Sequence, residues 1–191
     1  MKKRIALVVA MLGAIFAFAG SAVAAPPPPT SCTDNSYASK TTTKNFDVPA
    51  GATCDLSWAT INGNVTVEGS LVTYGTTTFN GNVTVNPGGT FAASNWGVKI
   101  NGNLLITNPE GANGFWGNQG GTSSEVTGNL TYTLTRDYPL YQQPYIYFGG
   151  GTKIDGNFTY NTGGRIGPPG WGYITAPDPT GLTVVKNTYI S

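Results

Sequence analysis

The sequence predicts an all-β fold: a single solenoid of parallel strands with about six coils and a disulfide-tied N-terminal cap. Three observations support this prediction. A seven-residue phrase recurs, its apolar and polar residues alternate, and no long stretch after Ala25 carries apolar residues at helical spacing. The five copies of the phrase are Ile61–Val67, Phe79–Val85, Ile100–Ile106, Val126–Tyr132 and Ile154–Tyr160.

Residues 1–24 predict a secretory signal peptide. Three basic residues precede an apolar run from Ile5 to Ala19, and Ala22–Ala24 forms an A-x-A cleavage signal. The alternative is a membrane anchor, but the run is shorter than the roughly 18–20 residues that a spanning helix needs. Residues 25–31 follow as a short, stiff Pro-rich lead-in. We therefore expect a secreted protein, extracellular or in the cell envelope, with no membrane contact after cleavage.

The charge of the exported chain argues against polyanionic partners. Without Lys2, Lys3 and Arg4, seven basic residues remain against nine acidic ones, a formal charge of −2. Charged residues make up only 10% of the whole chain, well below the roughly 25% of an ordinary domain. Nothing in this balance attracts nucleic acid or an anionic membrane.

The two cysteines, Cys32 and Cys54, predict a disulfide. In an exported protein an even pair is more often bridged than free. A bridge closing a loop of about 22 residues is worth roughly 3 kcal/mol on the loop-entropy model. The alternative, a pair of metal-ligating thiolates, has no histidine to support it. We assign residues 32–56 to an N-terminal cap and residues 57–191 to the solenoid.

The first copy of the phrase explains the predicted geometry. Ile61, Val65 and Val67 share one face, as alternate residues of a strand do. Gly63 falls on the inward parity, where a missing side chain lets the backbone bend or approach a neighbour closely. Asn64 tolerates turn conformations and can bond to the local backbone. The Gly-Asn pair therefore predicts a corner between two short strands.

The spacing of the phrases predicts how the coils stack. Successive copies start 18, 21, 26 and 28 residues apart, which suits coils of three short strands and three turns. The longer spacings predict inserted loops at Thr107–Glu125, Thr133–Thr152 and Asn161–Gly181. A last strand, Leu182–Ile190, would close the stack without a Gly-Asn corner. The edge beyond it would either remain open to a partner or a second copy, or stay free as a short edge protected by a charge such as that of Lys186.

Stacking would place like residues on like. The expected inward spine is Val65, Val83, Leu104, Leu130 and Phe158; the expected outward hydroxyl row is Thr66, Thr84, Thr131 and Thr159; the expected amide ladder is Asn64, Asn82, Asn103, Asn129 and Asn157. Two interpretations of the polar rows stay open. They form either a surface that meets ice, sugar or another polymer, or a ladder that satisfies only itself.

The rungs resemble a right-handed parallel β-helix over about residues 56–190. The phrases, with glycine between flanking apolar positions, are similar to those of bactofilin-like and secreted β-solenoid proteins. The hand of the coil follows from this resemblance and not from the spacing. Cytoskeletal bactofilins are not exported through a signal peptide, so the resemblance implies an architecture and not their role.

The sequence offers little for catalysis. The chain has no histidine, which removes the commonest general base and metal ligand. We therefore expect no metal, no cofactor and no catalytic residue. Because many β-helix proteins cleave polysaccharides, the alternative is a small lyase or hydrolase on the same scaffold. Its site would have to assemble from Asp137, Asp155 and Arg165 if their coils bring them together.

Aromatic residues in and near the predicted loops are the better candidates for binding. Tryptophan and tyrosine rings stack on the apolar faces of sugars, and amide side chains reach the hydroxyls. The candidate ligand-binding residues are Trp96, Trp116, Asn118, Tyr138, Tyr141 and Trp171. The alternative is that these rings fold their own loops onto the solenoid.

The sequence thus favours an exported, non-catalytic surface, matrix or adhesive protein that binds a polysaccharide or another cell-surface polymer. A degradative enzyme is one alternative. A structural unit that assembles through its C-terminal edge is the other.

Overall fold

The computed structural model describes residues 28–32, 37–94, 97–116, 123–138, 144–149, 151–163, 174–175 and 182–191. The predicted signal peptide lies outside these residues. Strands and turns make up the described part, and no helix in it has the length and apolar character needed to cross a membrane.

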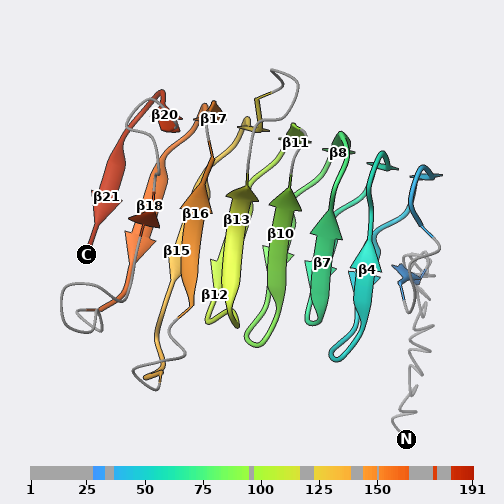
Figure 1. Cartoon of the computed structure of the whole chain (residues 1–191), viewed down its shortest axis with the longest axis horizontal. Coiled ribbons are helices and arrows are strands. Elements are labelled where there is room, and N and C mark those ends of the chain that lie inside the picture. Colours follow the sequence, from blue (N-terminus) through green and yellow to red (C-terminus); the bar gives the residue numbers. More distant parts are fainter. Residues whose placement is uncertain are drawn as a thin grey trace, which may run out of the picture.

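Three parallel sheets run side by side along the long axis of the molecule (Figure 1). Sheet A contains β1 (Thr30–Ser31), β3 (Phe46–Val48), β6 (Val65–Val67), β9 (Val83–Val85), β12 (Leu104–Thr107), β15 (Leu130–Thr133), β18 (Phe158–Asn161) and β21 (Thr188–Ile190). Sheet B contains β2 (Thr41–Thr42), β5 (Thr60–Ile61), β8 (Thr77–Phe79), β11 (Val98–Ile100), β14 (Glu125–Val126), β17 (Thr152–Ile154) and β20 (Leu182–Val184). Sheet C contains β4 (Thr53–Asp55), β7 (Ser70–Thr73), β10 (Thr90–Ser94), β13 (Ala112–Trp116), β16 (Tyr145–Phe148) and β19 (Ile174–Thr175).

The chain passes from sheet B to sheet A to sheet C and then begins the next coil. In the described residues, strands β2 to β19 form six coils of three strands each, with β1 before them and β20 and β21 after them. The predicted all-β solenoid of about six coils is therefore confirmed. Val65 lies beside Val83, in register, as the stacking of the phrases requires.

Each phrase forms the corner between sheet B and sheet A. Ile61 ends β5, Val65 begins β6, and Asn62 to Asn64 make the turn. The glycine is needed because the corners touch: a Cβ on Gly102 would lie 2.7 Å from the Gly81 carbonyl oxygen and 2.7 Å from Asn82 Oδ1. Gly81 and Gly128 are equally crowded by the coil before them.

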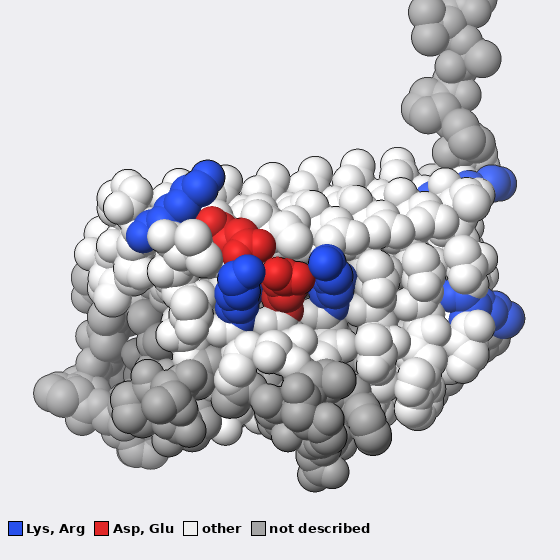
Figure 2. Space-filling model, turned by 90° about the horizontal axis from the view of Figure 1, so that it is seen from above, with Lys and Arg blue, Asp and Glu red and all other residues white. Residues whose placement is uncertain are grey.

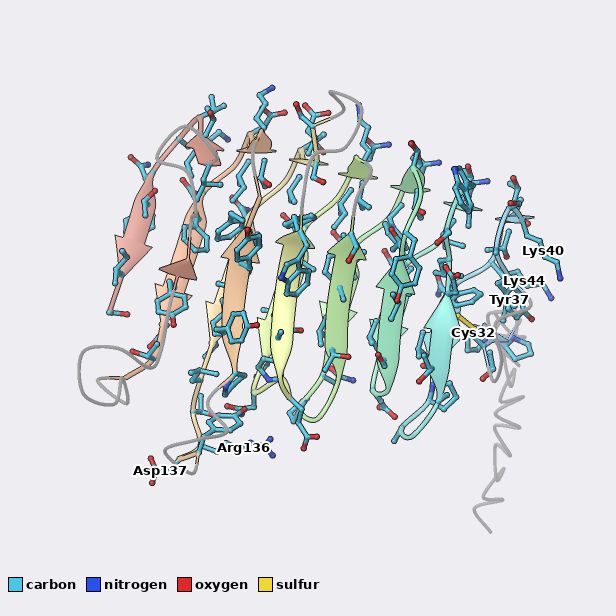
Figure 3. The ribbon with its side chains drawn as sticks, in the orientation of Figure 1. Cys32, Tyr37, Lys40, Lys44, Arg136 and Asp137 are labelled. Atoms are coloured by element: carbon cyan, nitrogen blue, oxygen red, sulfur yellow. A yellow bond between two sulfur atoms is a disulfide. The ribbon has the colours of Figure 1, made fainter. Side chains whose placement is uncertain are left out.

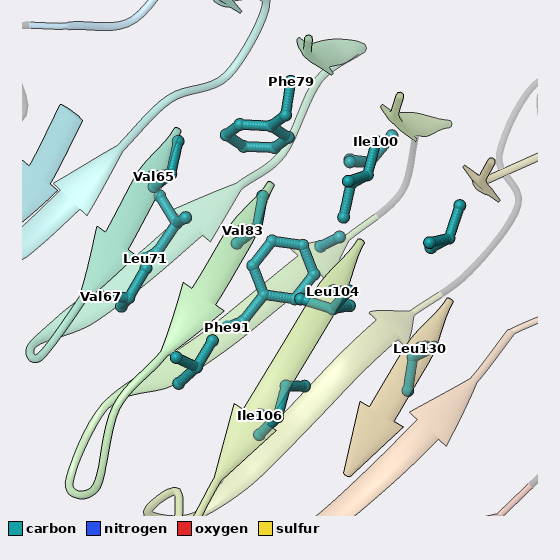
Figure 4. Close-up of a cluster of buried hydrophobic side chains, with 14 of the residues drawn as sticks. Val65, Val67, Leu71, Phe79, Val83, Phe91, Ile100, Leu104, Ile106 and Leu130 are labelled. Atoms are coloured by element: carbon teal, nitrogen blue, oxygen red, sulfur yellow. The ribbon is translucent and has the colours of Figure 1, made fainter. Parts of the chain in front are cut away.

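The core fills the inside of the rod. The expected spine from Val65 to Phe158 is buried and in register throughout sheet A. Aromatic rings from the other strands pack against it in a chain, with Phe91 5.6 Å from Phe115 and Phe115 6.2 Å from Phe148. Figure 4 shows part of this core, where side chains of successive coils point to the same interior.

The N-terminal segment is part of the stack. Residues 32–56, expected as a cap, contribute β2, β3 and β4, each paired in parallel with the next coil. The disulfide joins Cys32 to Cys54 across a Cα–Cα distance of 5.9 Å. Tyr37 packs edge-on against Phe46 with ring centroids 5.0 Å apart, so this end of the core is covered (Figure 3).

Two details differ from the sequence prediction. Leu182–Ile190 is not one strand: β20 and β21 are separated by a corner, where the Asn187 N–H donates to Asn157 Oδ1 at 3.3 Å. Each of the three segments expected as insertions also contains a sheet C strand of the coil itself, β13, β16 and β19 respectively. Tyr145 and Tyr147, which share a parity in the sequence, both belong to β16.

Candidate ligand-binding surface

The outer face of sheet C carries a stacked aromatic pair. Trp116 ends β13 and Tyr147 lies in β16, and both side chains are half-buried. Their ring centroids are 5.7 Å apart and their planes differ by 7°. This pairing fixes both rings while each keeps part of its surface in solvent. Tyrosine and tryptophan are residues that are enriched at binding interfaces.

Gly114 makes this arrangement possible. It faces Tyr147 across the sheet, and its φ of +117° lies in a region that other residues rarely adopt. A Cβ at this position would collide with the backbone of Tyr147. Glycine at this position therefore lets β13 and β16 approach closely beside the aromatic pair.

The other predicted binding residues fall into two groups. Trp96, Asn118, Tyr141 and Trp171 lie outside the described residues. Tyr138 is described, and it holds its own loop: its hydroxyl donates to the Pro109 carbonyl oxygen at 2.9 Å and its ring packs on the core. The Arg136 guanidinium lies over this ring at 4.6 Å. Burial raises the pKa of the Tyr138 hydroxyl, and Arg136 opposes this shift.

Two exposed aromatic residues beside sheet C were not identified from the sequence. Trp58 is 59% exposed and Tyr74 is 51% exposed, and both lie where sheet C turns toward sheet B. A positional signal was available: Trp58 precedes the first phrase by three residues, much as Trp96 precedes the third phrase by four. Both residues lie in coils without a predicted insertion, whereas the candidate residues lie in or near the predicted insertions.

The outer face of sheet B carries a column of paired charges. Glu125 contacts Lys99 at 3.2 Å and Lys153 at 3.3 Å, and Lys153 also contacts Asp155 at 2.7 Å. Hydrogen bonds to Asp155 and then to Glu125 raise the pKa of Lys153. Figure 2 shows these groups alternating in sign along the rod, so the column compensates its own charge.

The outer face of sheet A is polar and regular. Thr66 lies beside Thr84, and Thr131 beside Thr159, as the predicted hydroxyl row requires. Leu105 interrupts the row between them. A shallow groove runs over its N-terminal end, bounded by Pro29, Asp47, the first threonines and the asparagines of the corners. Burial, and then the charge of Glu68, raises the pKa of Asp47.

The carboxylates considered for catalysis are not brought together. Asp155 lies at the corner where sheet B passes to sheet A, whereas Asp137 lies beyond the opposite end of the sheet A strands. Figure 3 places Asp137 beside Arg136 at that far corner. Arg165 lies outside the described residues. Among the residues that are described, no group of three or more Cys, Asp or Glu side chains could hold a metal ion.

Comparison with known proteins adds no further constraint. No family model, no curated protein and no solved structure matches the chain. The surface itself is therefore the basis for any functional assignment.

Proposed function

We propose that this chain is an exported, non-catalytic protein of the cell surface or extracellular matrix that binds a neutral polysaccharide. The observation that carries the proposal is the partly exposed Trp116–Tyr147 stack on the outer face of sheet C. A pyranose ring has an apolar face that covers such a ring, and the surrounding hydroxyls hydrogen-bond to polar side chains.

The neighbouring chemistry supports a neutral ligand. Ser94, with a hydroxyl that can donate and accept, lies directly beside Trp116 in the sheet. The lysines of the sheet B column are already paired with carboxylates, so they offer little excess positive charge to a polyanion. The disulfide favours an oxidising compartment, in keeping with the signal peptide predicted from the sequence.

The test is the substitution Trp116→Ala. The wild type is first screened for binding to three immobilised neutral glycans: a β-glucan, an arabinoxylan and a galactomannan. The affinity of the Trp116→Ala variant for the glycan that binds should be about tenfold lower than that of the wild type, as expected for the loss of a central aromatic contact. Leu105→Ser is the matched control, because Leu105 is an exposed apolar residue on sheet A. Unchanged retention of Trp116→Ala, or retention of the wild type on none of the three glycans, would refute the proposal.

Self-association is a second candidate, favoured by the exposed C-terminal edge. In β21 all three residues are exposed, and Ile190 is 63% exposed although it lies beside the buried Tyr160. Because Tyr37 and the disulfide cover the N-terminal end of the core, a second copy would meet this edge with its own C-terminal edge.

Sedimentation velocity over a concentration series tests this second candidate. The wild type should form a dimer, and Ile190→Asp should remain monomeric because it places a charge in the joined cores. Thr183→Asp, an outward change in β20, should leave the dimer intact. A wild type that stays monomeric at the highest concentration would eliminate self-association.

A further inference from the structure

Trp58 is presented to solvent in a conformation that its own turn must enforce. Its φ is +58°, a left-handed value that is a genuine outlier for a bulky side chain. Its side chain is 59% exposed, so burial of the ring does not explain the conformation. Backbone strain of this kind persists only where the surroundings impose it, and it gathers at functional sites.

A hydrogen-bonded clamp supplies that constraint. Asp55 Oδ1 accepts from the Ser57 N–H at 2.8 Å and from the Ser57 hydroxyl at 2.5 Å. The same Ser57 oxygen accepts from the Tyr74 N–H at 2.6 Å. The Ala59 N–H closes the turn by donating to the Leu56 carbonyl oxygen at 3.0 Å. The turn that carries Trp58 is thereby tied both to itself and to the next coil.

The ring rests on the backbone of that next coil. A Cβ at Gly75 would collide with the Trp58 indole, so only glycine leaves room for the ring there. Tyr74, 51% exposed, directly precedes this glycine. Two exposed aromatic residues therefore lie at one corner, and the Trp58 ring is positioned there before any ligand arrives, which lowers the entropic cost of binding.

This pair lies on the same flank of the rod as Trp116 and Tyr147. Ala93 lies beside Thr73 and Ser94 lies beside Trp116, so the outward positions Tyr74, Ser94 and Trp116 follow one another along the sheet. Neighbouring strands are about 4.8 Å apart, which puts Tyr74 and Trp116 about 10 Å apart along the axis. Tyr147 belongs to the coil after Trp116.

We infer that one extended polysaccharide chain lies along this flank, parallel to the rod, and contacts the Trp58–Tyr74 pair and the Trp116–Tyr147 pair at the same time. The inference rests on the proposed function and adds to it the mode of recognition. The protein binds the interior of a polymer over several sugar rings, and it does not require a chain end. The hydroxyl of Ser94 lies between the two pairs, where it meets the polar groups of the bridging sugar.

Oligosaccharides of increasing length, prepared from whichever of the three glycans binds best, test this inference. For the wild type, affinity should rise with length until one chain spans both pairs and then level off. Trp58→Gly should abolish that rise, so that long chains bind about tenfold more weakly than to the wild type while short ones are unaffected. Glycine suits the φ of +58°, so the variant should fold; equal thermal melts verify this, and Leu105→Ser is again the control.

Hydroxyl-radical footprinting gives an independent result. A long oligosaccharide should protect Trp58 and Trp116 together. If Trp58→Gly binds long chains as tightly as the wild type, or weakens short and long chains equally, the inference fails. If the inference fails in this way but Trp116→Ala still loses binding, the proposed function stands without the inference of a chain that spans both pairs. If neither variant loses binding, both fail.

Discussion

Asparagine holds each corner of this protein to the next. Asn82 Oδ1 accepts from the backbone N–H of Asn103 at 2.8 Å, and Asn103 Oδ1 accepts from that of Asn129 at 2.8 Å. The same bond recurs along the rod from Asn45 to Asn187. The expected ladder, in which each amide bonds the next rung, is thus built mainly from bonds between a side-chain oxygen and a backbone N–H, and the Asn103 Nδ2 adds a side-chain bond by donating to Asn82 Oδ1 at 3.1 Å. Each of these bonds to a backbone N–H also gives a partner to a group that the sharp turn removes from the hydrogen bonding of the sheet.

The contrast between bonds to a backbone N–H and bonds between side chains predicts unequal effects of two neighbouring substitutions. Asn103→Ala removes the acceptor of a backbone N–H and should lower the free energy of unfolding by about 1 kcal/mol. Asn101→Ala removes only the exposed side-chain bond to Asn80 and should cost less than about 0.5 kcal/mol. Urea denaturation of both variants checks the order, and equal losses would contradict the role given to the ladder.

Two tyrosines are buried in the core with hydroxyls that make no hydrogen bond to the described residues. Tyr132 and Tyr160 stack with centroids 5.2 Å apart, and neither hydroxyl has a partner among the described residues. A buried hydroxyl without a hydrogen bond is unfavourable by about 1–3 kcal/mol. Tyr132→Phe should therefore raise the free energy of unfolding by about 1 kcal/mol, measured by urea denaturation at pH 7. A loss of stability would show that the hydroxyl is bonded after all.

Burial also raises the pKa of both phenols above the ordinary value of 10.0. Above that pH the unfolded chain releases protons that the folded chain retains, so stability is complete below pH 10 and falls as the pH rises further. Each such group contributes a slope of up to about 1.4 kcal/mol per pH unit. In Tyr132→Phe this alkaline slope should be shallower.

At the scale of the elements, the disulfide ties the segment before β2 to β4. Cys32 and Cys54 are both fully buried, so reductant should act slowly on the folded protein. The double variant Cys32→Ser, Cys54→Ser should lose about 2–4 kcal/mol of stability. Hydrogen exchange should locate the loosened amides in β1 to β4. Uniform loss along all coils would indicate that the bridge stabilises the rod as a whole.

The sequence was sufficient for the corners and the core, and for a physical reason. Glycine and asparagine recur at the same place in every phrase, so each phrase forms the same corner. The alternation of inward and outward residues in a strand then places Val65 and Leu104 in the core. Sheet C was harder to predict, because β13 and β16 carry no shared motif and lie within long spacings. Asn113 illustrates this: it is buried in β13, where its Oδ1 accepts from the Phe91 N–H at 2.8 Å.

The candidate surface was only half predictable for the same reason. Trp116 was identified because aromatic residues cluster in its segment, but its partner Tyr147 depends on the register of two sheet C strands. Trp58 depends on a left-handed backbone conformation and on contact with Gly75, which lies 17 residues later in the sequence and in the next coil of the stack. Such pairings follow from tertiary contacts, which spacing alone does not specify.

At the scale of the whole molecule, the rod has unequal ends. In the first complete coil Phe46 and Val48 are buried beneath Cys32 and Tyr37. At the other end Val185, Tyr189 and Ile190 are each more than half exposed. Since each coil of a solenoid contacts only its neighbours, the stability of a coil depends on having one on both sides.

This asymmetry predicts a gradient of local stability. Amides of β20 and β21 should exchange with solvent fastest among the described strands, those of β6, β9 and β12 slowest, and those of β3 at a rate close to the slow group because the N-terminal end is covered. Hydrogen exchange followed by mass spectrometry measures the order.

If the amides of β21 were instead protected at high protein concentration and lost this protection on dilution, a second copy would be covering the strand. Protection of β21 that is strong and independent of concentration would contradict the open end, because only contacts within one chain could then supply it.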